Sequence, residues 1–113
     1  MALVYKICTE AVWQEAAAKG IFAGATIDLT DGFIHLSTTA QAPVTAGLFF
    51  KTGNDLVLVE FDDQHLTGLK YEPSRGGELF PHVYGSIDIN LALNVSNLIR
   101  QTDGSLKFPD KMQ

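Results

Sequence analysis

The clearest hydrophobic pattern in the sequence lies between Asp55 and Asp62, where aliphatic residues follow one another almost without interruption. A short apolar run with polar turn residues at both ends is typical of a strand that is buried on both faces. Residues 3–8 alternate instead, which predicts a strand with at least one buried face. Shorter strands are predicted over residues 32–37, 69–72, 82–84 and 105–108 and in the first half of 87–95, whereas residues 96–101 fit either a strand or a helix.

The first segment with helical spacing follows the amino-terminal strand. Thr9 is a suitable N-cap, and the adjacent Glu10 is well placed for the helix dipole. Apolar residues recur at helical spacing over residues 12–17, and Gly20 is a natural helix end. We interpret this apolar stripe as part of the core rather than as a ligand site.

A second helix is predicted to end near Phe50. Its beginning has the spacing of a capping box, from Thr38 to Gln41. Pro43 complicates this prediction, because a helix capped by Thr38 would place the proline beyond its first turn. Alternatively, the helix restarts with Pro43 at its first position.

These elements predict one α+β domain over residues 1–113. The count is five to seven strands and two helices, with a turn-rich segment between Gly20 and the strand at 32–37. The helices come early and the strands late, so a regular alternation of strands and helices is excluded. A mixed, mostly antiparallel sheet with the helices packed on it fits this order.

Composition narrows the classes of partner. Lys and Arg number 8 and Asp and Glu 13, for a net charge of −5, and the two arginines are Arg75 and Arg100. This balance argues against binding to DNA, which needs several clustered cations, and leaves a small-molecule ligand as the expected partner. Cys8 is the one cysteine, so an internal disulfide is excluded, and we interpret it as a small buried residue. The chain has no apolar run long enough for a membrane span and no signal-peptide pattern, so we expect a cytoplasmic protein.

Residues 31–37 carry the first group of candidate functional side chains. With a period of two, Ile34 and Leu36 point to one face and belong to a core. Phe33, His35 and Ser37 share the other face, which is typical of a cleft wall with one stacking surface and two hydrogen-bonding groups. The alternative is a half-buried histidine with a purely structural role.

Residues 72–85 carry the second group. His82 and Tyr84 share one strand face, and the preceding loop combines Arg75 with Gly76 and Gly77. Such a loop can bring backbone N–H groups and a guanidinium close to an anion, although an ordinary hairpin turn explains the two glycines equally well. In a chain with so few arginines, Arg75 is the main anion contact available.

This inventory supports several kinds of chemistry. His35, His82 and Glu72 are candidate acid–base residues. The two histidines with Glu72 or Asp31 are also a formal set of metal ligands, but no local ligand pair supports a metal site. A nucleotide cleft fits better, with aromatic rings for stacking, polar groups for hydroxyls and Arg75 for a phosphate. The Phe80–Pro81 peptide is a candidate for a cis bond that orients His82.

The same residues carry a resemblance to a known family. The sequence contains Asp28-x-x-Asp31-Gly-Phe-Ile-His-Leu-Ser37 with Gln41 four residues on, and then Glu72-x-Ser74-x-Gly76-Gly77-x-x-Phe80-Pro81-His82-x-Tyr84-Gly85. With the opening Val4-Tyr5-Lys6-Ile7, these motifs resemble the bacterial family known as "domain of unknown function 952" over essentially the whole chain.

This resemblance implies an ADP-ribosyltransferase-like α+β fold, distantly similar also to the NAD-dependent RNA 2′-phosphotransferases. In those proteins a strand histidine in the position of His35 contacts the NAD ribose and a tyrosine packs on the nicotinamide, a role that Tyr84 matches. NAD is therefore a candidate cofactor, and the residues by themselves leave the cofactor open.

Three hypotheses follow for the function. The first is a transferase-like enzyme, the second a small-molecule sensor or binding module without turnover, and the third a structural hydrogen-bond network. The candidate catalytic residues are His35, Glu72 and His82, and the candidate ligand-binding residues are Phe33, Ser37, Gln41, Arg75, Gly76, Gly77 and Tyr84.

Overall fold

The computed structural model describes residues 2–112 and has the α+β composition that the sequence predicts. In this part of the chain the α-helices are α1 (Glu10–Lys19), α2 (Thr26–Asp31) and α3 (Gln41–Phe49). The strands are β1 (Leu3–Thr9), β2 (Ile21–Phe22), β3 (Ile34–His35), β4 (Ser37–Thr38), β5 (Leu56–Asp62), β6 (Leu69–Pro73), β7 (Leu79–Val83), β8 (Ile87–Asp88), β9 (Asn94–Arg100) and β10 (Leu106–Lys107).

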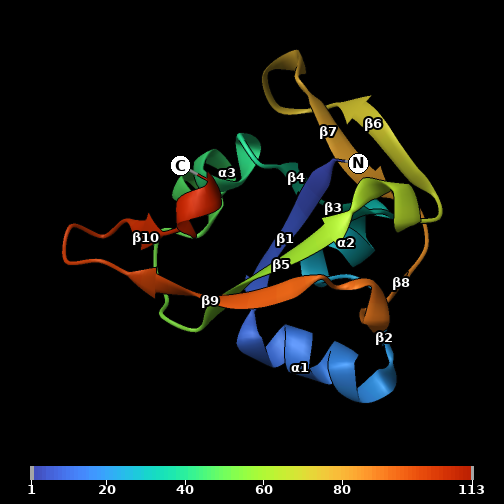
Figure 1. The fold of residues 1–113 in the computed structure, drawn as a ribbon. Coiled ribbons are helices and arrows are strands. Elements are labelled where there is room, and N and C mark those ends of the chain that lie inside the picture. Colours follow the sequence, from blue (N-terminus) through green and yellow to red (C-terminus); the bar gives the residue numbers. More distant parts are fainter. Residues whose placement is uncertain (1, 113) are drawn as a thin grey trace.

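The strands form three antiparallel sheets. The largest has the order β10-β9-β5-β1-β4, the second joins β3, β7 and β6 in the order β3-β7-β6, and the smallest pairs β2 with β8. The central pair is β1 with β5, in register from Leu3 opposite Asp62 to Thr9 opposite Leu56 (Figure 1). Every residue of β5 is buried, which confirms the prediction for this strand.

Two hydrophobic clusters lie on opposite faces of the β1–β5 pair. One contains Val4 and Val59 together with Trp13 of α1. The other contains Ile7 together with Ala46 of α3. Figure 1 accordingly shows α1 and α3 on different sides of these two strands. Because both faces of the pair are covered by protein, the side chains of β5 read as an apolar run rather than as a clean alternation.

The ends of α1 lie where the sequence predicts them. Thr9 Oγ1 accepts a hydrogen bond from the Val12 N–H at 3.3 Å, and Gly20 ends the helix with a φ of 86°. A left-handed residue is needed there, and glycine adopts that conformation without a steric penalty.

The beginning of α3 differs from both alternatives raised by the sequence. The Gln41 N–H donates to Thr38 Oγ1 at 3.3 Å, and the Thr38 N–H donates to Gln41 Oε1 at 3.1 Å, so the predicted capping pair forms. The helix itself begins at Gln41, which makes Pro43 its third residue. A proline is tolerated at this position because the first N–H groups of a helix have no intrahelical acceptor.

The prediction of two helices is wrong, because α2 lies in the segment interpreted as turns. Ile27 and Leu29 are 59% and 67% exposed, so α2 has no buried apolar stripe that periodicity could detect. Polar contacts fix it instead: the Asp28 carboxylate accepts from the Ala25 N–H at 2.8 Å, and Gly32 closes the helix with a φ of 87°.

The strand count in the described residues also exceeds the predicted five to seven. The predicted strand at 32–37 is divided at Leu36 into β3 and β4, which join different sheets. Ile21 and Phe22 add the short strand β2, which pairs with β8. Two-residue strands of this kind are defined by their partners and leave almost no local pattern in the sequence.

The β6–β7 hairpin connects through residues 74–78. The Ser74 N–H donates to the Glu78 carbonyl and the Gly77 N–H to the Ser74 carbonyl, both at 2.9 Å. Gly76 and Gly77 have φ values of 67° and 78°. The ordinary hairpin turn is therefore the observed role of the two glycines.

Gly68 fixes the other end of this hairpin. It has a φ of 79°, and a Cβ atom at this position would lie 2.5 Å from the Tyr84 carbonyl oxygen. The Tyr84 N–H donates to the Gly68 carbonyl at 3.0 Å. This close approach requires glycine and holds Tyr84 beside the start of β6.

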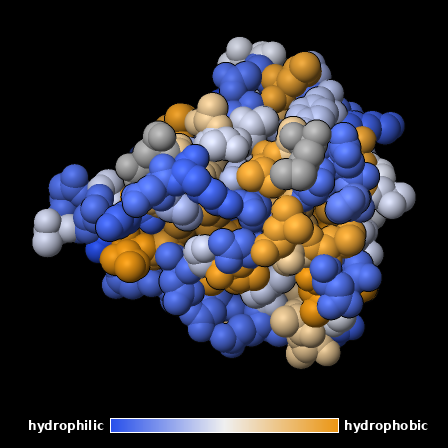
Figure 2. Space-filling view, in the orientation of Figure 1, coloured by the Kyte–Doolittle hydropathy of each residue, from blue (hydrophilic) through white to orange (hydrophobic). Residues whose placement is uncertain are grey.

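The surface is mixed in character. Figure 2 shows hydrophilic residues along the projecting β9–β10 hairpin and a group of hydrophobic residues near the middle of the same face. No helix in residues 2–112 is both long enough and apolar enough to cross a membrane.

Candidate functional site

A cavity of about 470 Å³ opens between β1, α2, β3, α3 and the β6–β7 hairpin. Its volume is ordinary for a small-molecule site. The polar and charged lining residues are Lys6, Asp31, His35, Ser37, Thr45, Ser74, Arg75 and His82, and the remainder are Tyr5, Ile7, Ile27, Leu36, Phe49, Phe50 and Phe80. Four of the candidates from the two motifs, His35, Ser37, Arg75 and His82, thus share one cavity.

The buried carboxylate of Asp28 anchors the His35 side of the cavity. Asp28 Oδ1 lies 2.7 Å from His35 Nδ1 and accepts the His35 backbone N–H at 3.0 Å. Lys6 Nζ lies 2.8 Å from Asp28 Oδ2 and donates to the His35 carbonyl at 3.1 Å. Lys6 and Asp28 are both buried, so β1, α2 and β3 are joined by one ion pair and its hydrogen bonds.

Two opposing effects act on the pKa of Asp28. Burial raises the pKa of this carboxyl, but the Lys6 ammonium and the hydrogen bonds from Lys6 and His35 outweigh burial and leave the pKa lowered. Asp28 is therefore held as a carboxylate, which is the form that balances the buried charge of Lys6.

The second nitrogen of His35 also faces a carboxylate. His35 Nε2 lies 3.0 Å from Asp31 Oδ2 at the cavity edge. The contact of Nδ1 with Asp28 is a hydrogen bond, whereas the contact of Nε2 with Asp31 is an ion pair only when the ring is protonated. His35 is thus fixed at both ends of its ring.

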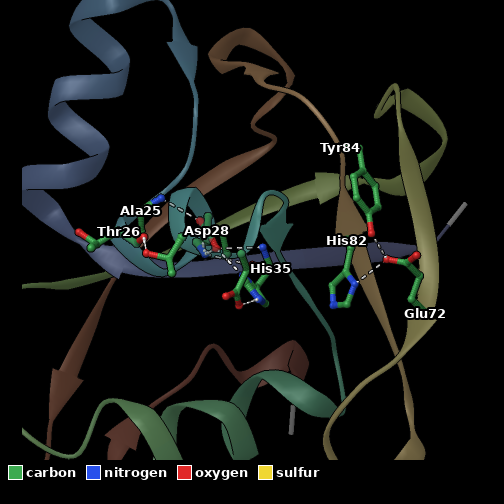
Figure 3. A network of polar contacts seen from close by, with 10 residues as sticks. Ala25, Thr26, Asp28, His35, Glu72, His82 and Tyr84 are labelled. Atoms are coloured by element: carbon green, nitrogen blue, oxygen red, sulfur yellow. Dashed lines mark hydrogen bonds and ion pairs between the residues drawn. The ribbon is translucent and has the colours of Figure 1, made fainter.

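His82 is held differently, from one side only. Its Nδ1 lies 2.9 Å from Glu72 Oε1, and the Tyr84 hydroxyl donates to the same oxygen at 2.8 Å (Figure 3). Hydrogen bonds from His82 and Tyr84 lower the pKa of Glu72, and the same contact raises the pKa of Tyr84. Glu72 and Tyr84 do not line the cavity. Glu72 contacts His82 directly, and Tyr84 contacts Glu72.

The ring of Phe33 connects the two histidines. Its centroid lies 4.6 Å from that of His35, 4.3 Å from that of His82 and 5.3 Å from that of Tyr84. The two imidazole rings meet edge to face with centroids 5.5 Å apart. Phe33 therefore packs against both rings and limits their rotation, but it does not line the cavity.

The predicted cis bond before His82 is wrong. The Phe80–Pro81 peptide is trans, as are the other peptide bonds of the described residues. The direction of His82 follows instead from its place in β7, where it pairs opposite both His35 and Lys70. Val83 points to the other face and is fully buried, in agreement with the predicted alternation.

Arg75 contributes a cation that has no carboxylate partner. Its guanidinium carbon lies 4.8 Å from the centroid of Phe80 and 5.9 Å from that of Phe49. Both terminal nitrogens donate to Thr45 Oγ1 at 3.4 Å, and Thr45 lies 3.3 Å from the Ser37 hydroxyl. No ion pair between residues 2 and 112 includes Arg75.

A second cavity, of about 420 Å³, lies where Glu10 and Asn54 meet β9 and contains none of the predicted site residues. The guanidinium that lines this second cavity is that of Arg100. It donates hydrogen bonds to the carbonyls of Phe50, Gly53 and Gly104. Because Arg100 is already used to tie loops together, the cavity at Arg75 is the stronger candidate for an anion site.

Besides Phe33 and Tyr84, three further predicted ligand-binding residues lie outside the cavity lining. Gln41 is buried, and its amide donates to Glu78 Oε1 at 2.7 Å and to the Leu79 carbonyl at 2.8 Å. With its oxygen bound to the Thr38 N–H, this side chain links α3 to the hairpin. Gly76 and Gly77 form the turn and do not line the cavity.

Sequence reasoning missed the roles of Lys6, Thr45 and Phe49. A lysine in the middle of a strand whose other residues are mostly apolar was the available signal for a buried ion pair. Thr45 and Phe49 lie in α3, where no sequence motif indicates a function. Only the tertiary structure brings them into contact with Arg75. The roles of Asp28 and Asp31 are likewise visible only from their distances to His35.

The carboxylates considered as metal ligands in the sequence, Asp31 and Glu72, each contact a histidine. Asp31 contacts His35, and Glu72 contacts His82. Within residues 2–112, no three His, Cys, Asp or Glu side chains are grouped to hold a metal ion. Cys8 is buried in β1, and burial raises its pKa to about 11, so it is a core residue rather than a reactive thiol.

Fold and site together define a small α+β domain whose cavity carries one unpaired guanidinium and two histidines. A family model described as "Protein of unknown function (DUF952)" matches residues 7–95. The chain belongs to this family, as the two sequence motifs indicate. A comparison with curated proteins gave no match.

Solved structures support the same assignment. A crystal structure of protein CC0527 from Caulobacter crescentus is 40% identical, with a TM-score of 0.92 and 97% of each chain covered. The solution NMR structure of CC0527 is 42% identical, with a TM-score of 0.83, 93% of this chain and 91% of that chain covered. These likenesses support the fold over nearly the whole length.

Proposed function

We propose that this protein binds a small anionic, nucleotide-like molecule in the cavity between α3 and the β6–β7 hairpin. The observation that carries the proposal is the Arg75 guanidinium, which lines the cavity without a carboxylate partner. A phosphate or carboxylate group of a ligand would supply the missing counter-charge through paired hydrogen bonds.

The surroundings of Arg75 favour this role. Phe80 and Phe49 pack against the guanidinium, and Thr45 accepts from both of its terminal nitrogens. A long flexible side chain is thereby restricted before a ligand arrives, which lowers the entropy lost on binding. The hydroxyls of Ser37 and Thr45 supply further hydrogen-bonding groups beside the same position.

Apolar residues at the cavity edge favour a ligand with an aromatic or otherwise apolar part. Ile27 and Phe49 both line the cavity and are 59% and 68% exposed. Exposed side chains of this size beside a polar floor are typical of sites that stack a base or a similar ring. An anionic group on Arg75 and a ring near Phe49 together describe a nucleotide.

A more specific hypothesis is a transferase related to the ADP-ribosyltransferases, and one observation favours catalysis of some kind. Glu72 holds His82 at 2.9 Å while His82 lines the cavity, an arrangement suited to acid–base work. In this hypothesis His82 acts on the ligand, Glu72 is a positioning residue, and His35 orients Asp31 rather than transferring a proton.

The fit of NAD to these residues is incomplete. Arg75 is available for one phosphate, but Tyr84, the residue expected to pack on the nicotinamide, lies outside the cavity with its hydroxyl on Glu72. Asp88 and Asp103, two acidic residues late in the described chain, are engaged in turns, since Asp88 Oδ1 accepts from the Asn90 N–H and Asp103 Oδ1 from the Ser105 N–H. A binding module without turnover is therefore kept as the alternative.

Binding of AMP, ADP-ribose and NAD tests the proposal. A ligand present at a hundredfold its dissociation constant adds about 2.7 kcal/mol to the free energy of unfolding, which thermal unfolding measures directly. We expect at least one of the three to stabilise the protein, and Arg75→Gln to abolish this stabilisation. The matched control is Lys19→Gln, which removes the same charge from the exposed face of α1, remote from the cavity lining.

The outcomes separate the hypotheses. No stabilisation by any of the three ligands, or equal stabilisation of the wild type and Arg75→Gln, contradicts the proposed binding. Mass spectrometry after prolonged incubation then separates an enzyme, which forms a new product, from a binding module, which returns the ligand unchanged.

A further inference from the structure

The two nitrogens of His82 have different surroundings. Nδ1 lies on Glu72 Oε1, outside the cavity, whereas Nε2 receives no hydrogen bond from any described residue. Figure 3 shows the ring with one nitrogen on Glu72 and the other turned away from it. Because no buried side-chain nitrogen or oxygen in residues 2–112 lacks a partner, Nε2 is not sealed in the core, and since His82 lines the cavity, Nε2 is the nitrogen left to reach it.

The partner of Nδ1 determines where the ring carries its proton. Two donors, His82 and the Tyr84 hydroxyl, converge on Glu72 Oε1, and both stabilise the ionised carboxylate. An ionised carboxylate only accepts hydrogen bonds, so Nδ1 must be the protonated nitrogen of the neutral ring. Nε2 then carries a lone pair and faces the cavity as an acceptor.

From this arrangement we infer that His82 selects ligands that carry a hydroxyl group near the anion bound by Arg75. The inference rests on the proposed function, since it concerns the same cavity. Arg75 supplies donors and a positive charge, and His82 Nε2 supplies an acceptor in the same cavity. The favoured class is a hydroxyl-bearing phosphate ester rather than an anion without an alcohol hydroxyl, such as pyrophosphate.

The first test compares matched ligands. AMP, 2′-deoxy-AMP and 3′-deoxy-AMP share their base and phosphate and differ by single hydroxyls. We expect AMP to bind about tenfold more tightly than one of the two deoxy analogues, which is the size of one hydrogen bond in a partly buried site. Calorimetric titration measures the three affinities, with inorganic pyrophosphate as the comparison anion that carries no alcohol hydroxyl.

Three variants test whether the preference for a hydroxyl-bearing ligand depends on the His82 tautomer with its proton on Nδ1. His82→Phe keeps a ring but has no acceptor, so the preference for the hydroxyl should disappear. Glu72→Ala leaves His82 in place but frees its proton to move to Nε2, so the preference should weaken. Tyr84→Phe is the matched control, because it removes one donor to Glu72 while leaving the Glu72–His82 bond intact, and the preference should persist.

A spectroscopic measurement tests the tautomer without any ligand. Nitrogen-15 NMR of the wild type near pH 8, where an ordinary imidazole is neutral, should show His82 protonated at Nδ1 and unprotonated at Nε2. A proton on Nε2 overturns the inference even if every variant fails to fold.

The possible results are distinct from those for the proposed function. Absence of binding by all the phosphate ligands contradicts the proposed function and this inference together. Binding of AMP and both deoxy analogues with equal affinity overturns the inference alone and leaves an anion site at Arg75. Tighter binding of pyrophosphate than of AMP also overturns it.

Discussion

His35 and His82 are neighbours with opposite surroundings. Both imidazoles contact an acidic side chain through Nδ1, and both pack on Phe33. His35, however, has a carboxylate at each nitrogen, and one of these carboxylates is tied to the buried Lys6. His82 is held only at Nδ1 and keeps Nε2 open to the cavity.

In the proposed function, this difference separates a histidine that stabilises the fold from one that contacts the ligand. The His35 side joins three elements of the fold through buried charges, so removing Lys6 or Asp28 alone leaves a buried ion without its counter-charge. The His82 side keeps one hydrogen-bonding position unused, which is the condition for recognising a ligand. Both histidines were candidates for catalysis in the sequence, and the structure supports different uses for them.

The largest expected loss of unfolding free energy comes from a substitution on the His35 side of the cavity. Asp28→Asn leaves the Lys6 ammonium buried without a counter-charge, and such losses cost about 3–5 kcal/mol of unfolding free energy. Urea denaturation measures the change. The double variant Lys6→Met with Asp28→Asn should recover part of the loss, and an Asp28→Asn protein as stable as the wild type would contradict the role of this ion pair.

A smaller effect is expected from substituting the two histidines themselves. His35→Asn removes contacts to Asp28 and Asp31 and should cost about 1–3 kcal/mol, whereas His82→Asn loses one bond to the partly exposed Glu72 and should cost about 1 kcal/mol. Ligand affinity should show the opposite order, with the greater loss in His82→Asn. If His82→Asn is the less stable protein and binds normally, the comparison between the two histidines is wrong.

The smallest expected change concerns acid conditions. The pKa of Asp28 is lowered in the folded protein, so its contribution to stability is complete above its unfolded pKa near 3.9. The stability contributed by Asp28 is lost as the pH falls from about 4 through its lower folded-state pKa. The reason is that the Asp28 carboxylate takes up its proton at a higher pH in the unfolded chain than in the folded protein. Unfolding free energies measured from neutral pH down to pH 3 should therefore decline less steeply for Asp28→Asn than for the wild type.

The sequence predicts the main elements because their signals are local. β5 follows from a buried apolar run, and α1 follows from a capping threonine and a terminal glycine. The hydrophobic spacing and the turn residues that set these boundaries lie within the segments themselves. The family motif also indicates the region of the site, since both of its halves supply residues to the cavity.

The elements that the sequence misses have no such signal. α2 exposes its apolar side chains and depends on the contacts of Asp28, and β2 exists because Ile21 and Phe22 meet β8. Gln41 likewise occupies a motif position that suggested a ligand contact. Its amide instead donates hydrogen bonds that join α3 to the β6–β7 hairpin. Long-range partners determine each of these features.

By itself, the sequence determined one α+β domain, its principal strands and helices, and the residue types available for chemistry. Only the tertiary structure decided which of those residues have free hydrogen-bonding positions. The reason is physical: a histidine or arginine has the same chemistry wherever it stands in the chain, and its use depends on which partners the fold brings within about 3 Å. Lys6 and Asp28 form an ion pair, and Asp28 also binds His35. Arg75 and His82 Nε2, by contrast, face the cavity without a charged partner.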